Sequence, residues 1–186
     1  MLLQSTGRFL FILGMSLWLG GVVFLGYGVA PVNFQTAETW ELQGDNPHLP
    51  EQPVNYRTIG GELTAGAIER LNHIELAGFL LAVIGLAINW YPRWNVSNNL
   101  IIRTILLIVM GMLFFYYSEI IGARLNEIRQ TVPLDFTDNG TNQLPAEQEE
   151  FDRLHSRYTL LSSVNALFCF LQLALISWVQ GNPKSG

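Results

Sequence analysis

Four long apolar segments constrain the fold of this 186-residue chain more than any other feature. The first, residues 9–30, reads FLFILGMSLWLGGVVFLGYGVA and contains no charged residue. A helix of that length crosses roughly 30 Å of hydrocarbon at about 1.5 Å per residue. Only 13% of all residues are charged, whereas soluble domains average about 25%. The sequence therefore predicts an integral membrane protein that contacts the lipid bilayer.

The predicted fold is an all-α, four-helix membrane bundle formed by one domain, residues 1–186. Trp and Tyr residues near the segment ends match the aromatic belt of membrane interfaces. Two longer connections, proline-rich or with turn-forming residues, are expected to be irregular loops. The predicted helices cover residues 8–30, 66–91, 100–127 and 147–180, and the predicted loops cover residues 31–61 and 131–146.

The distribution of charge predicts the orientation. All 15 acidic residues lie in residues 38–75 or 119–152, which flank the two long loops. The positive-inside rule then places both termini in the cytoplasm and both loops outside. We expect a bacterial-type cytoplasmic membrane or a related internal membrane, and the net charge of −5 argues against a nucleic-acid partner. The basic residues that mark the cytoplasmic side are Arg8, Arg93, Arg103 and Lys184.

The start of the fourth apolar segment is amphipathic. Its polar side chains share one face of a helix when they are plotted at helical spacing. Polar groups in membrane helices usually face protein rather than lipid, so we expect this face to point into the bundle. The face carries Asp152, His155, Thr159, Ser162 and Ser163, with Asn165 beside it.

The second and third segments also carry polar groups at the same end. Arg70 and His73 share one face of the second helix, whereas Glu75 points away from that face. Glu119 and Asn126 share a face of the third helix. We therefore expect a polar cluster between helices two, three and four at the outward end.

This cluster is open to more than one interpretation. It can be an ion-paired, hydrogen-bonded rim at the water interface, which needs no further function. It can also be a haem b or copper site with His73 and His155 as ligands. Arg70 would then pair with a haem propionate, and Asp152 would orient His155. Met112, which lies deeper in the third helix, is a candidate third ligand of copper.

The same groups can instead belong to a transport or proton path through Glu119, Asp152 and His155. Ionisable groups within a membrane mark such paths. In the cytoplasmic half of the spans, however, Arg103 is the only charged residue and lies near the edge. The sequence therefore shows no complete polar path.

Two stretches resemble a known family. GMSLWLGGVVFLGYGVAPVNF resembles the first helix of transmembrane-protein-205-like proteins, a family catalogued as a domain of unknown function, and FDRLHSRYTLLSSVN resembles their last helix. That family is distantly similar to copper-resistance D domains and to four-helix haem-binding membrane oxidases, which implies a metal or haem site. The oxidases carry a histidine in their first helix, and this chain has none there. The resemblance rests on Trp18, Gly20, Gly21, Pro31, Phe34, Phe151, Leu154, His155 and Asn165.

Three functions from different classes remain open at this point. The first is a haem- or copper-binding membrane protein with ligands from helices two and four. The second is a cofactor-free structural or assembly subunit, bound to other membrane-protein subunits. The third is a small transporter. No catalytic residue is predicted, and an enzyme is not favoured. The single cysteine, Cys169, excludes an intramolecular disulfide and is expected to be a buried hydrophobic side chain.

Overall fold

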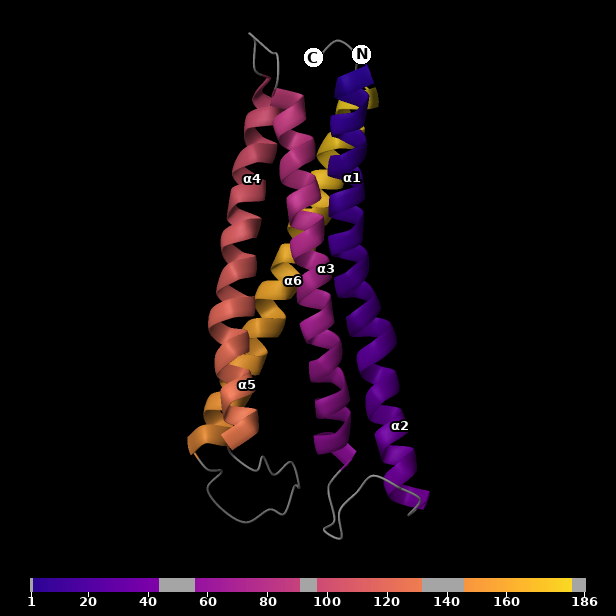
Figure 1. The fold of residues 1–186 in the computed structure, drawn as a ribbon, viewed down its shortest axis with the longest axis vertical. Helices are drawn as coiled ribbons and strands as arrows, with labels where there is room; N and C mark the ends of the chain where they lie inside the picture. Colours follow the sequence, from indigo (N-terminus) through magenta and orange to yellow (C-terminus); the bar gives the residue numbers. More distant parts are fainter. Residues whose placement is uncertain (1, 44–55, 91–96, 132–145, 182–186) are drawn as a thin grey trace.

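The computed structural model describes residues 2–43, 56–90, 97–131 and 146–181, and this part of the chain is helical. Four continuous rods are formed, and each contains a span that is long and apolar enough to cross a membrane. The prediction of an all-helical chain with four such spans is confirmed (Figure 1). The elements are α1 (Leu2–Val23), η1 (Phe24–Val29), α2 (Ala30–Gln43), α3 (Tyr56–Trp90), α4 (Asn98–Phe115), η2 (Tyr116–Ile121), α5 (Gly122–Thr131) and α6 (Ala146–Gly181).

The first rod is longer than the sequence predicted. α1 continues through the π-helical turn η1 into α2, so the expected irregular loop over residues 31–61 is wrong for residues 31–43 and 56–61. Pro31 is the second residue of α2, two residues after the end of η1. A proline lacks the N–H and crowds the carbonyl of the preceding turn, so it is usually accommodated where a helix departs from regular α geometry. The remaining residues of that loop, and residues 132–145 of the second loop, lie outside the described residues.

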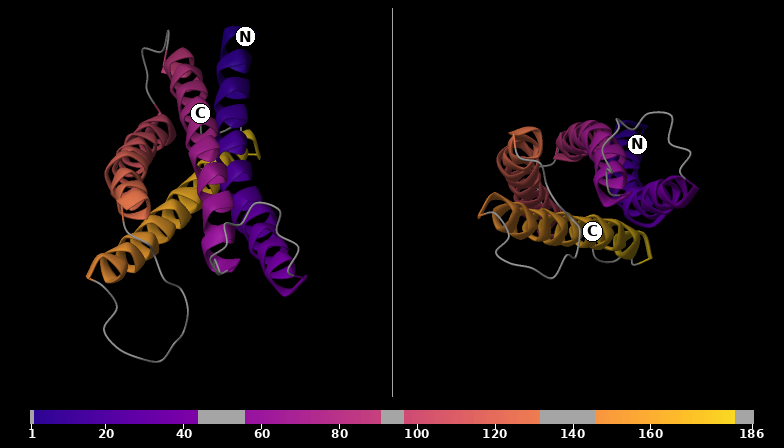
Figure 2. Two further views of the ribbon diagram at one scale, coloured as in Figure 1. Left: turned by 60° about the horizontal axis from the view of Figure 1, so that its bottom comes forward. Right: turned by 90° about the horizontal axis from the view of Figure 1, so that it is seen from below.

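The rods pack unequally. α1 and α3 run side by side along most of their length, and α2 continues along the first half of α3. α6 crosses the other helices obliquely and packs on α1 and α4 (Figures 1 and 2). α3 and α4 make few contacts and diverge away from the end where the chain termini lie. We call the end of the molecule where the chain termini lie the terminus end, and the opposite end the loop end.

Glycines set the distance between α1 and α3. A Cβ atom added to Gly78 would lie 2.7 Å from the carbonyl oxygen of Gly14. One added to Gly7 would lie 2.9 Å from the carbonyl oxygen of Gly85. The two pairs are seven residues apart on each helix, so they repeat along one antiparallel seam. Close backbone approach through small residues is typical of membrane helix pairs.

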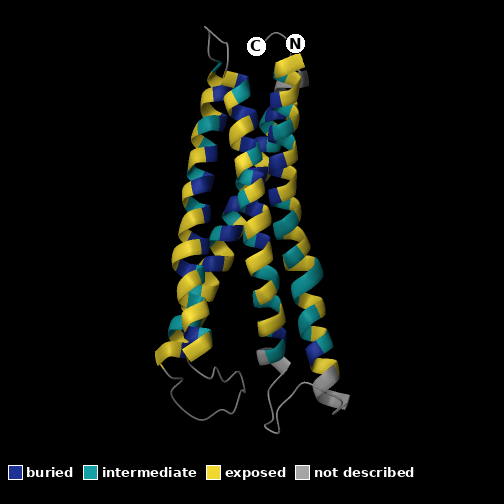
Figure 3. Ribbon diagram, in the orientation of Figure 1, coloured by how far each residue is buried: buried dark blue, intermediate teal, exposed yellow. Residues whose placement is uncertain are grey.

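Aromatic rings fill the space where the rods converge. Trp18 packs edge-to-face on Phe79 and Phe114, with ring centroids 5.9 and 5.6 Å apart. Phe114 packs in the same way on Tyr117, and Tyr117 on Tyr158. Buried residues follow the inner faces of the rods, and exposed ones the outer faces (Figure 3). Many exposed side chains in the spans are large and apolar, as contact with lipid requires, including Phe9, Ile105, Ile108, Leu160, Leu167 and Phe170.

Candidate functional site

A carboxyl group lies inside the helical assembly. Glu75 of α3 is fully buried within the span Ile59–Trp90. The indole Nε1 of Trp18 donates a hydrogen bond of 2.9 Å to Glu75 Oε1. The hydroxyl of Tyr117 lies 3.0 Å from Glu75 Oε2. Both carboxyl oxygens are therefore bonded to side chains from other rods.

Further polar side chains surround this centre. Asn165 Nδ2 lies 3.4 Å from the Tyr117 hydroxyl and 3.2 Å from the carbonyl oxygen of Met110. Asn165 Oδ1 is buried and has no hydrogen-bond partner in the described part of the chain. The Tyr158 hydroxyl donates to Asn72 Oδ1 at 2.9 Å, one turn of α3 before Glu75. The site thus combines groups from α1, α3, η2 and α6.

Local backbone structure brings these groups together. Trp18 lies one turn after Gly14, and Glu75 lies one turn before Gly78, so the close contact between the two glycines also brings the indole to the carboxyl group. Tyr117 lies in the π-helical turn η2, where it is buried. Short π-helical segments are frequent at functional sites.

A second group of buried polar side chains lies toward the terminus end. Gln172 Nε2 donates to the carbonyl oxygen of Arg103 at 2.8 Å. The Arg103 guanidinium lies 4.1 Å from the centre of the Phe11 ring. Asn89 Nδ2 donates to the carbonyl oxygen of Gly85. Polar groups are therefore buried in the terminus half of the spans as well, where the sequence had shown no complete polar path.

The structure places the residues of the predicted polar cluster differently. Two of them, Ser162 and Asn165, are buried as expected. The other eight are exposed, which corrects the expectation that their faces point into the bundle. Polar groups toward the ends of membrane helices reach headgroups or water and need no interior partner, whereas Arg70 and His73 lie near the middle of α3, on its exposed side. The exposed ones are Arg70, His73, Glu119, Asn126, Asp152, His155, Thr159 and Ser163.

The environment of His155 is local. Its ring stacks on Phe151, with centroids 6.0 Å apart. The hydroxyls that follow it bond within their own helix: Thr159 donates to the carbonyl oxygen of His155, and Ser163 donates to that of Thr159. Such back-bonding satisfies a hydroxyl without any ligand. Asn165 lies beside this face and belongs to the buried site.

The two predicted ligands, His73 and His155, lie on exposed surfaces of their helices. His73 makes no hydrogen bond or ion pair within the described part of the chain, and both side chains are exposed. Residues 2–43, 56–90, 97–131 and 146–181 hold no group of three or more His, Cys, Asp or Glu side chains that could bind a metal. Met112, the candidate third ligand, is 60% exposed. The haem or copper site between helices two and four stays a prediction that these observations do not support.

Sequence reasoning missed Glu75, Trp18 and Tyr117 as a unit. The helical wheel placed Glu75 opposite the polar face of its helix, and that position is correct. The signal lay in its neighbours, since Glu75 shares a face with Gly78 and Gly85, whose small size marks a helix contact. An acidic residue on such a face is buried between helices.

These observations define an integral membrane protein with a hydrogen-bonded carboxyl group in its helical interior. Comparisons of the chain with protein-family models, curated proteins and solved structures find no match.

Proposed function

We propose that this chain is a proton-transferring transport protein, a four-helix bundle in which Glu75 gains and loses the proton. The observation that carries the proposal is the burial of Glu75 inside a membrane span, with hydrogen bonds to Trp18 and Tyr117. Ionisable groups within membrane spans mark proton and solute paths. Within the transporter hypothesis we therefore assign the proton-binding role to Glu75 instead of Glu119, Asp152 and His155.

The two neighbours of the carboxyl group have different chemistry. The Trp18 indole can only donate a hydrogen bond, whereas the Tyr117 hydroxyl can donate and accept. An ionised Glu75 accepts from both groups. A protonated Glu75 donates its own hydrogen to the Tyr117 oxygen, which lies 3.0 Å from Oε2. Proton exchange is therefore expected on the Tyr117 side, while Trp18 holds the other oxygen in place.

Polar groups continue from this centre in both directions. Toward the loop end, the Tyr158 hydroxyl and Asn72 lie next to the site. Toward the terminus end, Asn165 and Gln172 lie seven residues apart on the buried face of α6. Both amide oxygens are buried and have no hydrogen-bond partner among the described residues. Each oxygen can therefore accept a hydrogen bond from the species that carries the proton. These positions support a route for protons on either side of Glu75.

The proposal is tested by proton flux in liposomes. Purified protein is reconstituted with a pH-sensitive dye inside the vesicles, and a potassium diffusion potential drives proton entry. We expect flux from the wild-type protein, loss of flux in Glu75→Gln, and reduced flux in Tyr117→Phe. Glu69→Gln is the matched control, because Glu69 lies on the same helix and is exposed.

Folding of each variant is checked by its elution as a single species in detergent. Absence of wild-type flux above that of empty vesicles contradicts the proposal, as does full flux in a folded Glu75→Gln variant. Either result would leave the site as a structural network and favour the alternative of a cofactor-free assembly subunit. The resemblance to transmembrane-protein-205-like proteins is compatible with both functions.

A further inference from the structure

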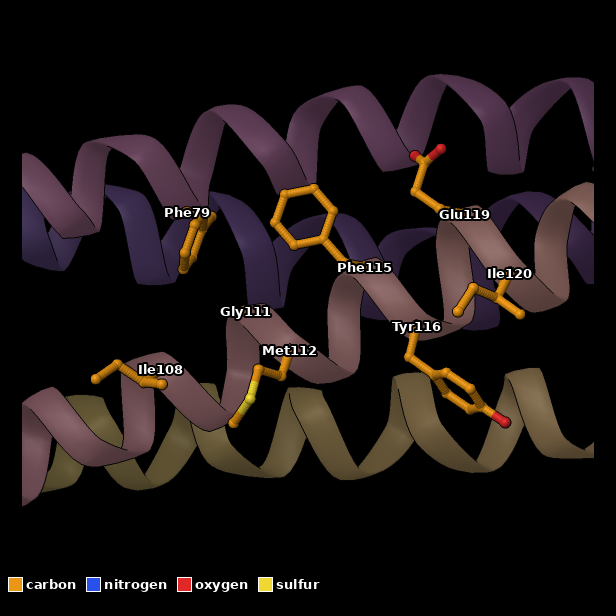
Figure 4. A pocket seen from close by; sticks show the side chains of 8 residues that line it. All are labelled: Phe79, Ile108, Gly111, Met112, Phe115, Tyr116, Glu119 and Ile120. Atoms are coloured by element: carbon orange, nitrogen blue, oxygen red, sulfur yellow. The ribbon is translucent and has the colours of Figure 1, made fainter.

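A groove runs along the outer surface between α3 and α4. It is shallow and largely open on its outer side, with a volume of about 620 Å³. Its lining is apolar apart from the Tyr116 hydroxyl and the carboxylate of Glu119, which lies at one end. Phe115 and Glu119 point from the α4–η2 rod toward α3, which contributes Phe79 (Figure 4).

The groove exists because α3 and α4 diverge and two aromatic rings hold them apart. A Cβ atom on Gly111 would lie 2.8 Å from Phe79 Cζ, so the ring of Phe79 lies directly on the α4 backbone. Phe79 also packs edge-to-face on Phe115, with centroids 6.5 Å apart. These rings form the floor of the groove, and its other side faces the surrounding lipid.

The length of the groove along the helix matches the hydrocarbon thickness of one leaflet of a bilayer. Its lining extends along the helix from Ile108 to Ile120, which corresponds to about 18 Å at 1.5 Å per residue. One leaflet contributes about half of the roughly 30 Å of hydrocarbon. Glu119 lies 21 residues after Asn98, the first residue of α4, or about 32 Å along the rod. The apolar part of the groove therefore lies at acyl-chain depth, and Glu119 lies at headgroup level on the loop side.

The charge of Glu119 indicates which kind of lipid headgroup the groove suits. Glu119 is exposed, and no basic side chain in the described part of the chain pairs with it. A carboxylate beside an apolar groove suits an amphiphile with a cationic head. A primary ammonium group can donate hydrogen bonds to the carboxylate, whereas a quaternary choline group cannot.

We infer that the groove is a lipid site: it holds one acyl chain of an ethanolamine phospholipid, whose ammonium group binds the Glu119 carboxylate. The chain lies against Phe79, Phe115 and Met112. This site is separate from the carboxyl centre at Glu75 and does not depend on the proton-transfer proposal.

Native mass spectrometry tests the inference. Delipidated full-length protein in mild detergent is titrated with ethanolamine, choline and glycerol phospholipids that carry identical acyl chains. We expect the ethanolamine lipid to bind about tenfold more tightly than the other two, the factor that one charge-assisted hydrogen bond provides. Glu119→Gln removes that preference and retains chain binding, whereas Glu69→Gln leaves the preference intact.

A second pair of variants tests the groove itself. Met112→Trp fills the groove and is expected to abolish binding of the ethanolamine lipid. Leu167→Trp adds the same bulk at a lipid-facing position of α6 and leaves binding unchanged. Equal binding of the three headgroups by the wild-type protein overturns the assignment of Glu119. Unchanged lipid binding in Met112→Trp overturns the assignment of the groove.

Discussion

The close contact between α1 and α3 predicts a large cost for one added methyl group. In Gly78→Ala the new Cβ would lie 2.7 Å from the carbonyl oxygen of Gly14 and 3.3 Å from the backbone nitrogen of Trp18. Ordinary contact begins at 3.4 Å, so α1 must move by about 0.7 Å. Both neighbours are backbone atoms and cannot rotate away.

Overpacking of this kind costs about 1–3 kcal/mol. Replacing glycine by alanine also stabilises a helix interior by about 1 kcal/mol. Gly66→Ala serves as the control, because Gly66 lies in the same helix and a Cβ there meets nothing within 4 Å. The propensity gain is common to both variants, so the difference between them isolates the steric cost. Gly78→Ala is expected to be less stable than Gly66→Ala by about 1–3 kcal/mol.

The assay is equilibrium unfolding in mixed micelles, with increasing sodium dodecyl sulfate and helix content or fluorescence as the signal. The same variant is expected to weaken the bond between Trp18 and Glu75, since the shifted backbone carries the indole. Equal stability of the two alanine variants would refute the reasoning, because it would mean that the helices do not meet at Gly78.

Three further predictions concern single side chains. Trp18→Phe leaves Glu75 Oε1 without its donor and is expected to reduce the free energy of unfolding by about 1–3 kcal/mol in the same assay; unchanged stability would contradict the bond. Cys169 is fully buried, so a maleimide should label it only after unfolding in sodium dodecyl sulfate; rapid labelling in mild detergent would place it at the surface. Arg124→Gln breaks an exposed ion pair with both oxygens of Glu150, and its small effect on the unfolding midpoint should vanish at high salt, unlike that of a buried pair.

The four spans could be predicted because hydrocarbon thickness fixes the length of an apolar helix. The extent of the first rod could not, because the proline content of residues 31–61 predicted an irregular loop there. In the structure the helix departs from α geometry in the π-helical turn Phe24–Val29, which ends two residues before the proline, and then continues as α2. Such a local adjustment depends on packing against α3, which the sequence of one segment does not reveal.

The candidate site shows where pattern reasoning succeeds and fails. The rule that polar faces point inward holds at hydrocarbon depth, where Asn165 is buried. It fails for His155, which lies toward the loop end of α6 and is exposed, and also for His73, which lies in the middle of α3, two residues before Glu75, on the exposed side of that helix. The interior face of α3 is instead marked by its glycines, and Glu75 lies on it. Partners such as Trp18 come from another helix, so only the packed structure identifies them.

Proton exchange at Glu75 is the central claim, and infrared spectroscopy tests it most directly. Difference spectra of the protein in lipid, recorded between acid and alkaline pH, report the carbonyl band of each protonated carboxyl group. We predict a reversible band that is lost in Glu75→Gln and kept in Glu69→Gln. A difference spectrum that is the same in the wild-type protein and in Glu75→Gln would show that this carboxyl group does not exchange its proton, and it would contradict the account.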